Sequence, residues 1–478
     1  MNITKKFAAL AVTGALLVTG LSVAQSAQAA RIPGTITVTP TSGNASDLNF
    51  LNSIAVSVGA PQGFRAISGT FVYQDGFELG SIANLRNGSM AEAAGTDGLD
   101  GLPVFMDRSI IPTNNFVSNK RLNELLLPLV TGDFELRFYY FANSGNPNRV
   151  TDPYVKLDMT YNSVTGAWAV APFTPPTTAR LAGENRFETA IEISSAFAPD
   201  VERVYVATGF GFADALGATP AAAHFDSPLL LTPSDSVPAN VLTEIERLSP
   251  ETIVVTGGAA VISGGVVAQL EALAFNPTVV RIGGANRFET SRFIAEDAFG
   301  VDGATTAYIA TGTNFPDALA AGPAAATFDG PVVLVDGAAL TVDGATLALL
   351  DDLGVTDIRI AGGTAVVSAA IQTQLTGLYP SVTRNAGGNR FETAVAINAD
   401  AFVFSDTVFL ATGFNFADAL TGAALAGFLG APLFVVEPTC VPQAVLDAIT
   451  DLDAEEVVLL GGNAALSPAV ASLTSCSV

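Results

Sequence analysis

Histidine and cysteine are nearly missing from this chain, and their scarcity removes whole classes of chemistry. The 478 residues contain one histidine, His224, and two cysteines, Cys440 and Cys476. Residues 177–478 contain no lysine, so all positive charge there is arginine. Without repeated histidine, lysine or free cysteine, this region lacks the groups for a catalytic triad, a zinc site or a thiol nucleophile. We therefore expect no enzyme activity, no metal site and no cofactor.

Positive charge is also scarce. The formal net charge is −24, and it becomes −26 without residues 1–29, which hold two lysines and no acid. A chain this acidic repels nucleic acid and anionic lipid, so we expect neither as a partner. Arginine offers a planar fork to carboxylate or phosphate, so any recognition of an anionic group must be local and geometric.

Long apolar runs are missing everywhere except at the start. The first residues carry Lys5 and Lys6, an apolar run over 7–23 and the small-residue pattern Ala27-Gln28-Ala29. This predicts a secretory signal peptide, residues 1–30, cleaved near Ala29. No later stretch approaches the ~20 apolar residues of a membrane span, so we expect an exported protein without one.

The two cysteines fit an exported protein, because such proteins usually pair their cysteines. We expect a disulfide between Cys440 and Cys476. Closing that loop should contribute roughly 4 kcal/mol in the chain-entropy model, and its role should be structural, as a staple for the end of the sequence.

Residues 31–171 have the period of two that is typical of half-buried strands. Apolar residues alternate in five segments: 35–38, 54–58, 70–73, 134–140 and 154–159. The run 159–170 predicts a closing hairpin. We expect an all-β domain here, an Ig-like sandwich. Proline and threonine then mark a stiff linker over 172–178.

The remaining sequence repeats itself three times, with a period of about 100 residues. Asn-Arg-Phe-Glu-Thr occurs at 185–189, 286–290 and 389–393. Each copy continues from Ala-Thr-Gly to Asp-Ala-Leu, at 207–216, 310–319 and 411–420. A paired-glycine turn follows in each, at Gly257-Gly258, Gly362-Gly363 and Gly461-Gly462. This predicts three domain-sized modules, over 179–280, 281–383 and 384–478.

Each module alternates buried strands with amphipathic helices. In the first, short apolar runs at 204–207, 228–231 and 252–255 indicate strands covered on both faces. Helical spacing appears near 212–224, 238–248 and 264–273. The order βαβαβα predicts an α/β fold with a mainly parallel sheet, Rossmann-like or Toprim-like. With no Pro/Ser-rich linker between copies, we expect one compact unit with near-threefold symmetry.

The first motif begins a helix. Asn and Glu three residues apart form a capping box, and the Phe begins the apolar face, where we expect it in the core. The arginine is different, because a cation in the first turn opposes the helix dipole. Arg186, Arg287 and Arg390 therefore need either a carboxylate inside the protein or an anion outside it. Both alternatives stay open.

The second motif places Asp214, Asp317 and Asp418 at the start of the next helix, where the dipole stabilises negative charge. In open parallel sheets this is also the end where ligands bind. The aspartates are the obvious partners for the arginines. A pair across two modules would build an interface beside the ligand crevice, so we take these six residues as the candidate polymer-binding or interface set.

Other motifs do not support catalysis or nucleotide binding. The glycine turns lack the third glycine of the dinucleotide fingerprint. Serines after the paired glycines precede helices and are predicted to be N-caps: Ser263, Ser368 and Ser467. The one histidine lies beside an alanine run that indicates a buried helix.

Taken together, the repeated motifs resemble the cell-wall-binding repeat 2 family over about residues 177–478. The third copy departs slightly, since Gly388 precedes Asn389 where the others have Glu or Ala. The resemblance implies three modules around a pseudo-threefold axis on an exported protein of a Gram-positive bacterium. It also implies non-covalent attachment to an anionic cell-wall polysaccharide or secondary wall polymer.

Two other functions stay open. The first is a wall-remodelling enzyme with its activity in the N-terminal domain, because such repeats often accompany amidase or protease domains. Residues 31–176 contain no histidine or cysteine, which argues against zinc and thiol hydrolases. The second is a structural subunit of a surface layer, which would form ordered arrays. The sequence predicts neither the oligomeric state nor the ligand of the β domain.

Overall fold

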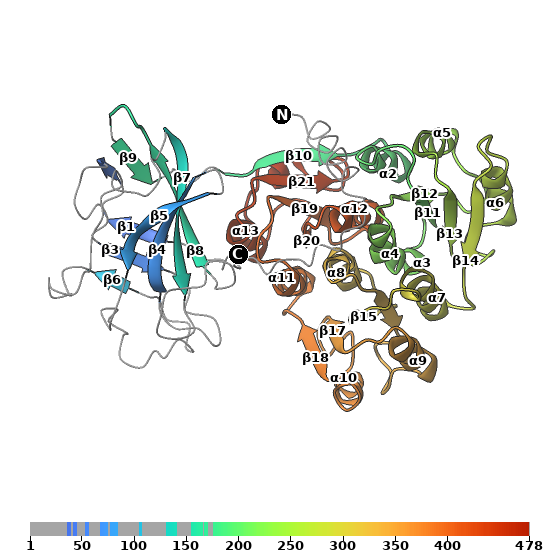
Figure 1. The fold of residues 1–478 in the computed structure, drawn as a ribbon. Helices are drawn as coiled ribbons and strands as arrows, with labels where there is room; N and C mark the ends of the chain where they lie inside the picture. Colours follow the sequence, from blue (N-terminus) through green and yellow to red (C-terminus); the bar gives the residue numbers. More distant parts are fainter. Residues whose placement is uncertain are drawn as a thin grey trace. The chain divides into compact units, whose positions relative to one another are not determined.

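The structure is a computed structural model, and it divides between Pro175 and Pro176 into two compact units. Figure 1 shows the strands of one unit and the strands and helices of the other. The described residues are 36–39, 42–44, 53–56, 67–74, 77–84, 105–107, 131–140, 154–165, 167–170 and 175–477. The expected signal peptide lies outside them. No helix among the described residues has the length and apolarity that crossing a membrane would require.

The described strands of the N-terminal unit form two antiparallel sheets. One contains, in order, β1 (Ile36–Thr39), β3 (Ser53–Val56) and β6 (Phe105–Asp107). The other contains, in order, β2 (Ser42–Asn44), β9 (Ala167–Val170), β8 (Tyr154–Tyr161), β7 (Gly132–Tyr140), β4 (Ile67–Gln74) and β5 (Phe77–Asn84). The all-antiparallel pairing confirms the prediction of a β domain, and its Ig-like topology stays a prediction.

Alternation along β7 shows why this region folds as strands. Phe134 and Leu136 are buried, whereas Glu135 and Arg137 lie on the other face and form an ion pair at 2.8 Å. The predicted hairpin joins β8 to β9, and its turn is held by Asn162, whose Oδ1 accepts hydrogen bonds from two backbone N–H groups.

In the second unit, the repeats form three four-stranded parallel sheets. The first sheet has the order β12 (Leu229–Thr232), β11 (Arg203–Thr208), β13 (Thr252–Thr256) and β14 (Thr278–Ile282). The segments between its strands contain α3 (Ala213–Leu216), α4 (Ala218–His224), α5 (Ala239–Leu248) and α6 (Gly264–Glu271). The parallel pairing confirms the expected α/β fold. Its apolar strands need helices on both faces of the sheet to keep them from water.

The second and third sheets repeat this order. The second contains β16 (Val332–Val335), β15 (Thr306–Thr311), β17 (Asp357–Ala361) and β18 (Ser381–Asn385). The third contains β20 (Leu433–Val436), β19 (Thr407–Thr412), β21 (Glu456–Leu460) and β10 (Thr177–Leu181). The other helices are α2 (Arg186–Ser194), α7 (Arg287–Phe299), α8 (Pro316–Thr327), α9 (Gly344–Asp352), α10 (Ala369–Thr376), α11 (Arg390–Ala401), α12 (Ala417–Phe428), α13 (Gln443–Asp451) and α14 (Pro468–Ala471).

Each sheet takes its fourth strand from the start of another repeat. β14 and β18 cross the module limits expected at 280/281 and 383/384, and β10 begins inside the expected linker. β10 then pairs with β21, from Thr177 beside Glu456 to Leu181 beside Leu460. In these fourth strands every residue but the last is exposed or half-buried, so they lack the continuous apolar runs that revealed the other three. The shared strands close the three repeats into a ring.

An arginine locks each shared strand in place. Arg180 on β10 donates to the carbonyls of Gly461 (2.5 Å) and Leu466 (2.9 Å) in the third repeat. Arg281 and Arg384 do the same for the turns of the first and second repeats. These three arginines were not predicted as functional residues from the sequence, although each stands six residues before the motif arginine of its copy.

Around the centre of the ring, α4, α8 and α12 contact one another pairwise (Figure 1). Three equivalent phenylalanines meet there, with ring centroids 5.4, 5.7 and 5.9 Å apart: Phe212, Phe315 and Phe416. A Cβ on Gly427 would lie 2.8 Å from the Cβ of Ala223 and 3.1 Å from that of Ala326, so small residues allow the close approach. The near-equal triangle confirms the threefold arrangement.

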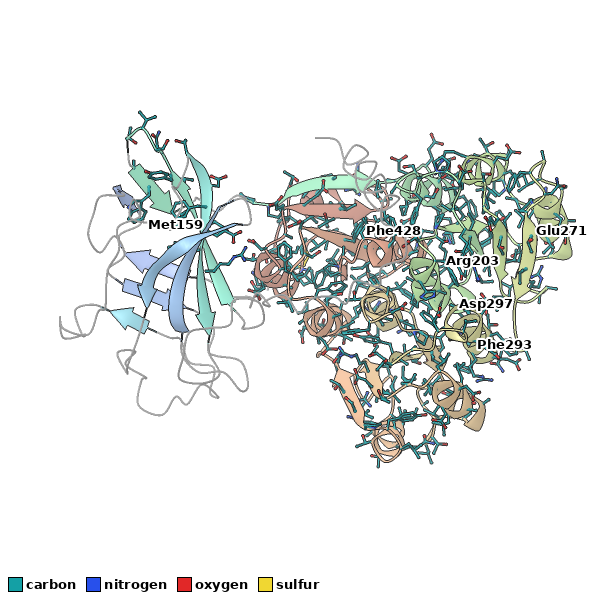
Figure 2. The ribbon with its side chains drawn as sticks, viewed as in Figure 1. Met159, Arg203, Glu271, Phe293, Asp297 and Phe428 are labelled. Atoms are coloured by element: carbon teal, nitrogen blue, oxygen red, sulfur yellow. A yellow bond between two sulfur atoms is a disulfide. The ribbon has the colours of Figure 1, made fainter. Side chains whose placement is uncertain are left out.

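The three joints between repeats differ in chemistry. Arg203 on β11 pairs with Asp297 on α7 at 2.7 Å (Figure 2). Arg359 on β17 pairs with Asp400 on α11, at the equivalent position of the next helix. In the first repeat that position is Ala196. The third joint is instead apolar, with the rings of Phe197 and Phe428 4.8 Å apart.

The expected disulfide between Cys440 and Cys476 is present. Beside it, Val441 N–H donates to the Thr474 carbonyl, and Cys476 N–H donates to the Val441 carbonyl. The bond therefore holds the segment after α14 against the start of α13, which is the structural role expected.

Replacing Arg180 with Met should weaken the closure of the ring. Two hydrogen bonds from a charged donor are lost and two carbonyls are left without it, so we expect unfolding to cost about 1.5–3 kcal/mol less. Calorimetry of Arg180→Met measures this. As a control, Arg292→Met removes an ion pair with the exposed Asp343 and a hydrogen bond to Thr346, and it should cost only about 1 kcal/mol. A parent-like melting temperature for Arg180→Met would contradict the role of this contact.

The first joint also contains the one histidine, and it should make stability depend on pH. His224 Nδ1 lies 2.6 Å from Asp329 Oδ1 of the second repeat. This hydrogen bond raises the pKa of His224 against the opposing effect of burial, and it lowers the pKa of Asp329. The histidine's contribution is thus complete below its unfolded pKa of about 6.5 and is lost as pH rises through the higher folded value.

We therefore expect the parent to melt above His224→Gln near pH 5.5, with the difference shrinking by about pH 9. Asp329→Asn should remove the same pH dependence. Thermal melts of the three proteins across this range provide the test, and an equal difference at both pH values would count against the ion pair.

Candidate functional site

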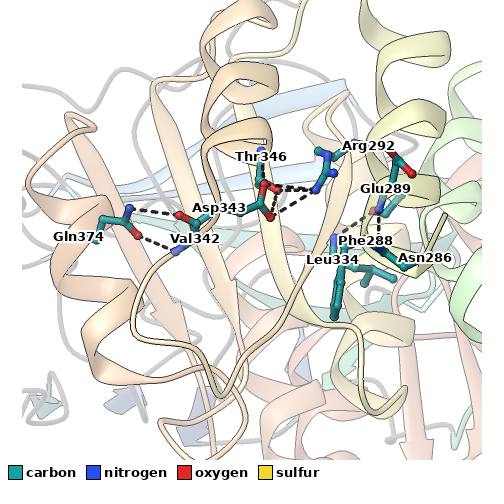
Figure 3. A network of polar contacts seen from close by, with 10 residues as sticks. Asn286, Phe288, Glu289, Arg292, Leu334, Val342, Asp343, Thr346 and Gln374 are labelled. Carbon is teal, nitrogen blue, oxygen red and sulfur yellow. Dashed lines mark hydrogen bonds and ion pairs between the residues drawn. The ribbon is translucent and has the colours of Figure 1, made fainter. Parts of the chain in front are cut away.

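The repeated motif begins α2, α7 and α11 with the expected capping box. Asn286 Oδ1 accepts hydrogen bonds from the N–H groups of Phe288 (3.0 Å) and Glu289 (3.1 Å), as Figure 3 shows. The Glu289 carboxylate reaches back to the N–H of Ala285 at 2.5 Å. Thr290, the last residue of the motif, accepts from Gly284 N–H at 3.0 Å. Asn, Glu and Thr of the motif are thereby accounted for by local structure.

The motif phenylalanines are half-buried and pack against the hydrophobic core, so the expectation that they lie in the core holds in part. Their rings also cover the loop after the first strand. A Cβ on Gly209 would lie 2.7 Å from the Phe187 ring, and the same crowding occurs between Gly312 and Phe288. The glycine of Ala-Thr-Gly is therefore required by its close approach to the ring.

The motif arginines bind that same loop. Nη1 of Arg287 donates to the carbonyl of Gly312 at 2.6 Å. Arg186 and Arg390 donate in the same way to Gly209 and Gly413. Each of these carbonyls is the single hydrogen-bond acceptor of its arginine within residues 175–477. No carboxylate of that region lies within 4.0 Å of the three guanidinium groups.

The other arginines of residues 175–477 have more partners. Four form ion pairs with carboxylates: Arg203, Arg247, Arg292 and Arg359. Three donate to two carbonyls each: Arg180, Arg281 and Arg384. A guanidinium has five N–H donors, so the motif arginines keep most of theirs available.

The motif aspartates lie in the first turns of α3, α8 and α12, as expected. Each also contacts the paired-glycine turn of its own repeat. A Cβ on Gly362 would lie 2.4 Å from Asp317 Oδ2, and one on Gly461 would lie 2.2 Å from Asp418 Oδ2. These glycines have φ of +106° and +97°, so both backbone conformation and space require glycine.

Arginine and aspartate come together across repeats. Burial raises the pKa of Asp317 to about 6, and Arg390 of the third repeat opposes the rise. Burial also raises the pKa of Asp418, opposed by the Thr189 hydroxyl and by Arg186 of the first repeat. Arg390 and Arg186 therefore interact electrostatically with a carboxylate of a neighbouring repeat without forming a close ion pair with it.

The third arginine, Arg287, also lies near the neighbouring repeat's aspartate loop, but its relation to Asp214 is less direct. Arg287 of the second repeat lies 5.7 Å from the ring of Phe212, two residues before Asp214 of the first repeat. All six candidate residues thus lie at boundaries between repeats, around the phenylalanine triangle. Their part in binding a ligand stays a prediction.

The serines after the paired glycines occupy N-cap positions, as predicted. Only Ser368 caps with its side chain, accepting from Ile371 N–H at 3.2 Å. On α7, Arg292 reaches Asp343 and Thr346 at the start of α9, and Gln374 on α10 bonds the backbone of Val342 (Figure 3). These contacts hold the helices of one repeat together.

Three stretches of the chain match the sequence model of one protein family, Cell wall binding domain 2 (CWB2). They are residues 180–267, 281–372 and 384–471, together more than half of the chain. Each stretch contains one copy of the motif arginine, the motif aspartate and the paired-glycine turn.

Two curated relatives come from Bacillus subtilis (strain 168). The N-acetylmuramoyl-L-alanine amidase LytC is 28% identical over 294 residues, 61% of this chain and 57% of the relative. The Amidase enhancer is 29% identical over 309 residues, 64% of this chain and 41% of the relative. The chain thus spans only about half the length of these relatives.

Two solved structures share the fold. Cwp6 from Clostridium difficile has a TM-score of 0.58 and 21% identity, covering 94% of this chain and 67% of that one. Cwp8 from the same organism has a TM-score of 0.57 and 22% identity, covering 72% and 59%. At this identity the likeness concerns the fold alone.

Gly362 and Gly363 offer a matched pair for testing the contact between turn and aspartate. Gly362→Ala places a methyl group against Asp317 at a positive φ, so we expect a loss of about 1–3 kcal/mol in the free energy of unfolding. Nothing lies within 4 Å of a Cβ on Gly363, so Gly363→Ala should be neutral or stabilise by up to about 1 kcal/mol. Equal denaturation midpoints for the two variants would refute this account.

Proposed function

The chain belongs to the Cell wall binding domain 2 family, and from this we propose that its three repeats hold an exported protein to an anionic wall polymer. The attachment is non-covalent, and the protein displays the N-terminal β domain at the cell surface. The observation that supports the proposal is the set of motif arginines, Arg186, Arg287 and Arg390, whose donors are largely unused.

The charge of the chain fits local recognition. A protein with net charge −24 attracts a polyanion only where arginines gather away from close carboxylates. A guanidinium can then grip a phosphate or carboxylate with two parallel hydrogen bonds. Because one polymer carries many acidic groups, three weak contacts on one rigid ring can combine into tight attachment.

The proposal treats the protein as a binder rather than an enzyme. The relatives' names, an amidase and an amidase enhancer, favour a second candidate, a part in wall remodelling carried by the N-terminal domain. Residues 31–176 lack histidine and cysteine, so zinc and thiol hydrolysis are poor fits for that part. A surface-layer subunit would use the same repeats, and ordered arrays of purified protein would identify it.

Replacing all three motif arginines with glutamine should abolish sedimentation of the protein with purified Gram-positive cell walls. Each arginine also holds one loop carbonyl, so the free energy of unfolding should fall by only about 1 kcal/mol per site. Arg292→Gln removes an arginine that already has a carboxylate partner and should leave wall binding unchanged. A folded triple variant that binds like the parent would refute the proposal.

Binding by the separate parts identifies where the activity lies. We expect the 177–478 fragment to bind walls and the 31–176 fragment not to bind. Stripping secondary polymers from the walls should remove the binding. If only the 31–176 fragment bound cell walls, the repeats would not be the binding part and the proposal would be wrong.

A further inference from the structure

The loop that receives each motif arginine also carries one variable position directly after its glycine. The residue there is Phe210 in the first repeat, Thr313 in the second and Phe414 in the third. All three are exposed, Phe210 by 64% and Phe414 by 55%. Two equivalent loops thus each present an aromatic ring that is mostly open to solvent.

These two rings are held in place. Phe210 meets the motif Phe187 edge-on, with centroids 5.9 Å apart, and Phe414 lies 6.3 Å from Phe391. The backbone N–H of Phe210 donates to the Thr208 hydroxyl at 3.3 Å, and Phe414 has the same bond. The rings are therefore ordered platforms that bind with little further loss of conformational freedom.

A motif arginine with spare donors also lies over each ring. The Cζ atom of Arg186 is 5.5 Å from the centre of Phe210, and that of Arg390 is 5.0 Å from Phe414. A largely exposed apolar ring and a cation with unused N–H groups are thus presented at one place. This combination matches a sugar ring that carries an acidic group, because its C–H face stacks on the aromatic ring while its anion binds the guanidinium.

The second repeat keeps the loop but lacks the ring. Thr313 N–H donates to the Thr311 hydroxyl at 3.3 Å, so the backbone is held as in the other repeats. Arg287 lies near Phe212 of the central triangle instead. This site offers a cation without an exposed aromatic platform of its own.

We propose that Phe210 and Phe414 are stacking platforms for the sugar rings of an anionic glycan, and that the site at Thr313 binds charge alone. The inference rests on the proposed function and adds the residues that distinguish a glycan from other polyanions. A protein partner fits less well, since a stable protein interface buries on the order of 1,000 Å² or more and each platform is a single ring.

The test uses the full chain and measures binding to Gram-positive cell walls and to three soluble polyanions. Phosphomannan and polygalacturonate carry sugars with phosphate and carboxylate groups, whereas polyphosphate carries charge only. Phe210→Ala and Phe414→Ala should each weaken binding to walls and to one of the two glycans by about fivefold, the double variant more, with polyphosphate binding unchanged. The glycan affected identifies the acidic group.

Thr313→Phe supplies a gain of function at the third site and should tighten wall binding by about threefold. Phe293→Ala removes another exposed phenylalanine, on α7 (Figure 2), and serves as the control that should bind like the parent. Melting temperatures verify that all variants fold.

The results distinguish failure of the stacking platforms from failure of wall binding by the repeats. If the parent binds walls and the Phe210→Ala, Phe414→Ala double variant binds equally well, the platforms are refuted and the proposed function stands. If the double variant loses polyphosphate binding as well, the rings act through the arginines and the inference is also overturned. If the parent does not bind walls, both proposals fail.

Discussion

The pairing of β10 with β21 is the constraint on which the repeat unit depends. Each sheet has three strands of its own repeat and one from another, so no repeat completes its sheet alone. In a linear array the last sheet would keep an unpaired edge, which is a liability for a soluble protein. Here the start of the first repeat supplies the missing strand, β10, to the third sheet. Arg180 on that strand donates to the carbonyls of Gly461 and Leu466, in the paired-glycine turn after β21.

Closure explains why the repeated motifs lie where they do. The shared strand leads directly into the motif helix, so the motif arginine arrives at a boundary between repeats. The aspartate from the neighbouring repeat reaches the same boundary because its helix starts beside the paired-glycine turn. Most of the motif therefore serves to build the boundary. The spare donors of the arginine are the part that folding leaves unused.

The symmetry of the ring is approximate, and its joints and loops differ in chemistry. Two joints carry an arginine–aspartate pair, and the third replaces it with Phe197 against Phe428. Two loops carry an exposed phenylalanine, and the third carries Thr313. A shared fold thus tolerates different side chains at equivalent places, since each joint needs only a satisfied charge or a packed ring. Such differences allow three similar sites to contribute unequally.

The sequence by itself determined the parallel α/β repeats, their capping boxes, the disulfide and the six candidate residues. These follow from local patterns, because apolar runs, cap residues and cysteine pairs act over short distances or leave few alternatives. Only the tertiary structure decided that strands are exchanged between repeats and that Phe187 lies against a loop. It also decided that Arg186 interacts electrostatically with Asp418 without forming a close ion pair with it. The pairing of β10 with β21 and the approach of Arg186 to Asp418 bring together segments more than 200 residues apart, and such meetings arise from packing around the central helices rather than from any local pattern.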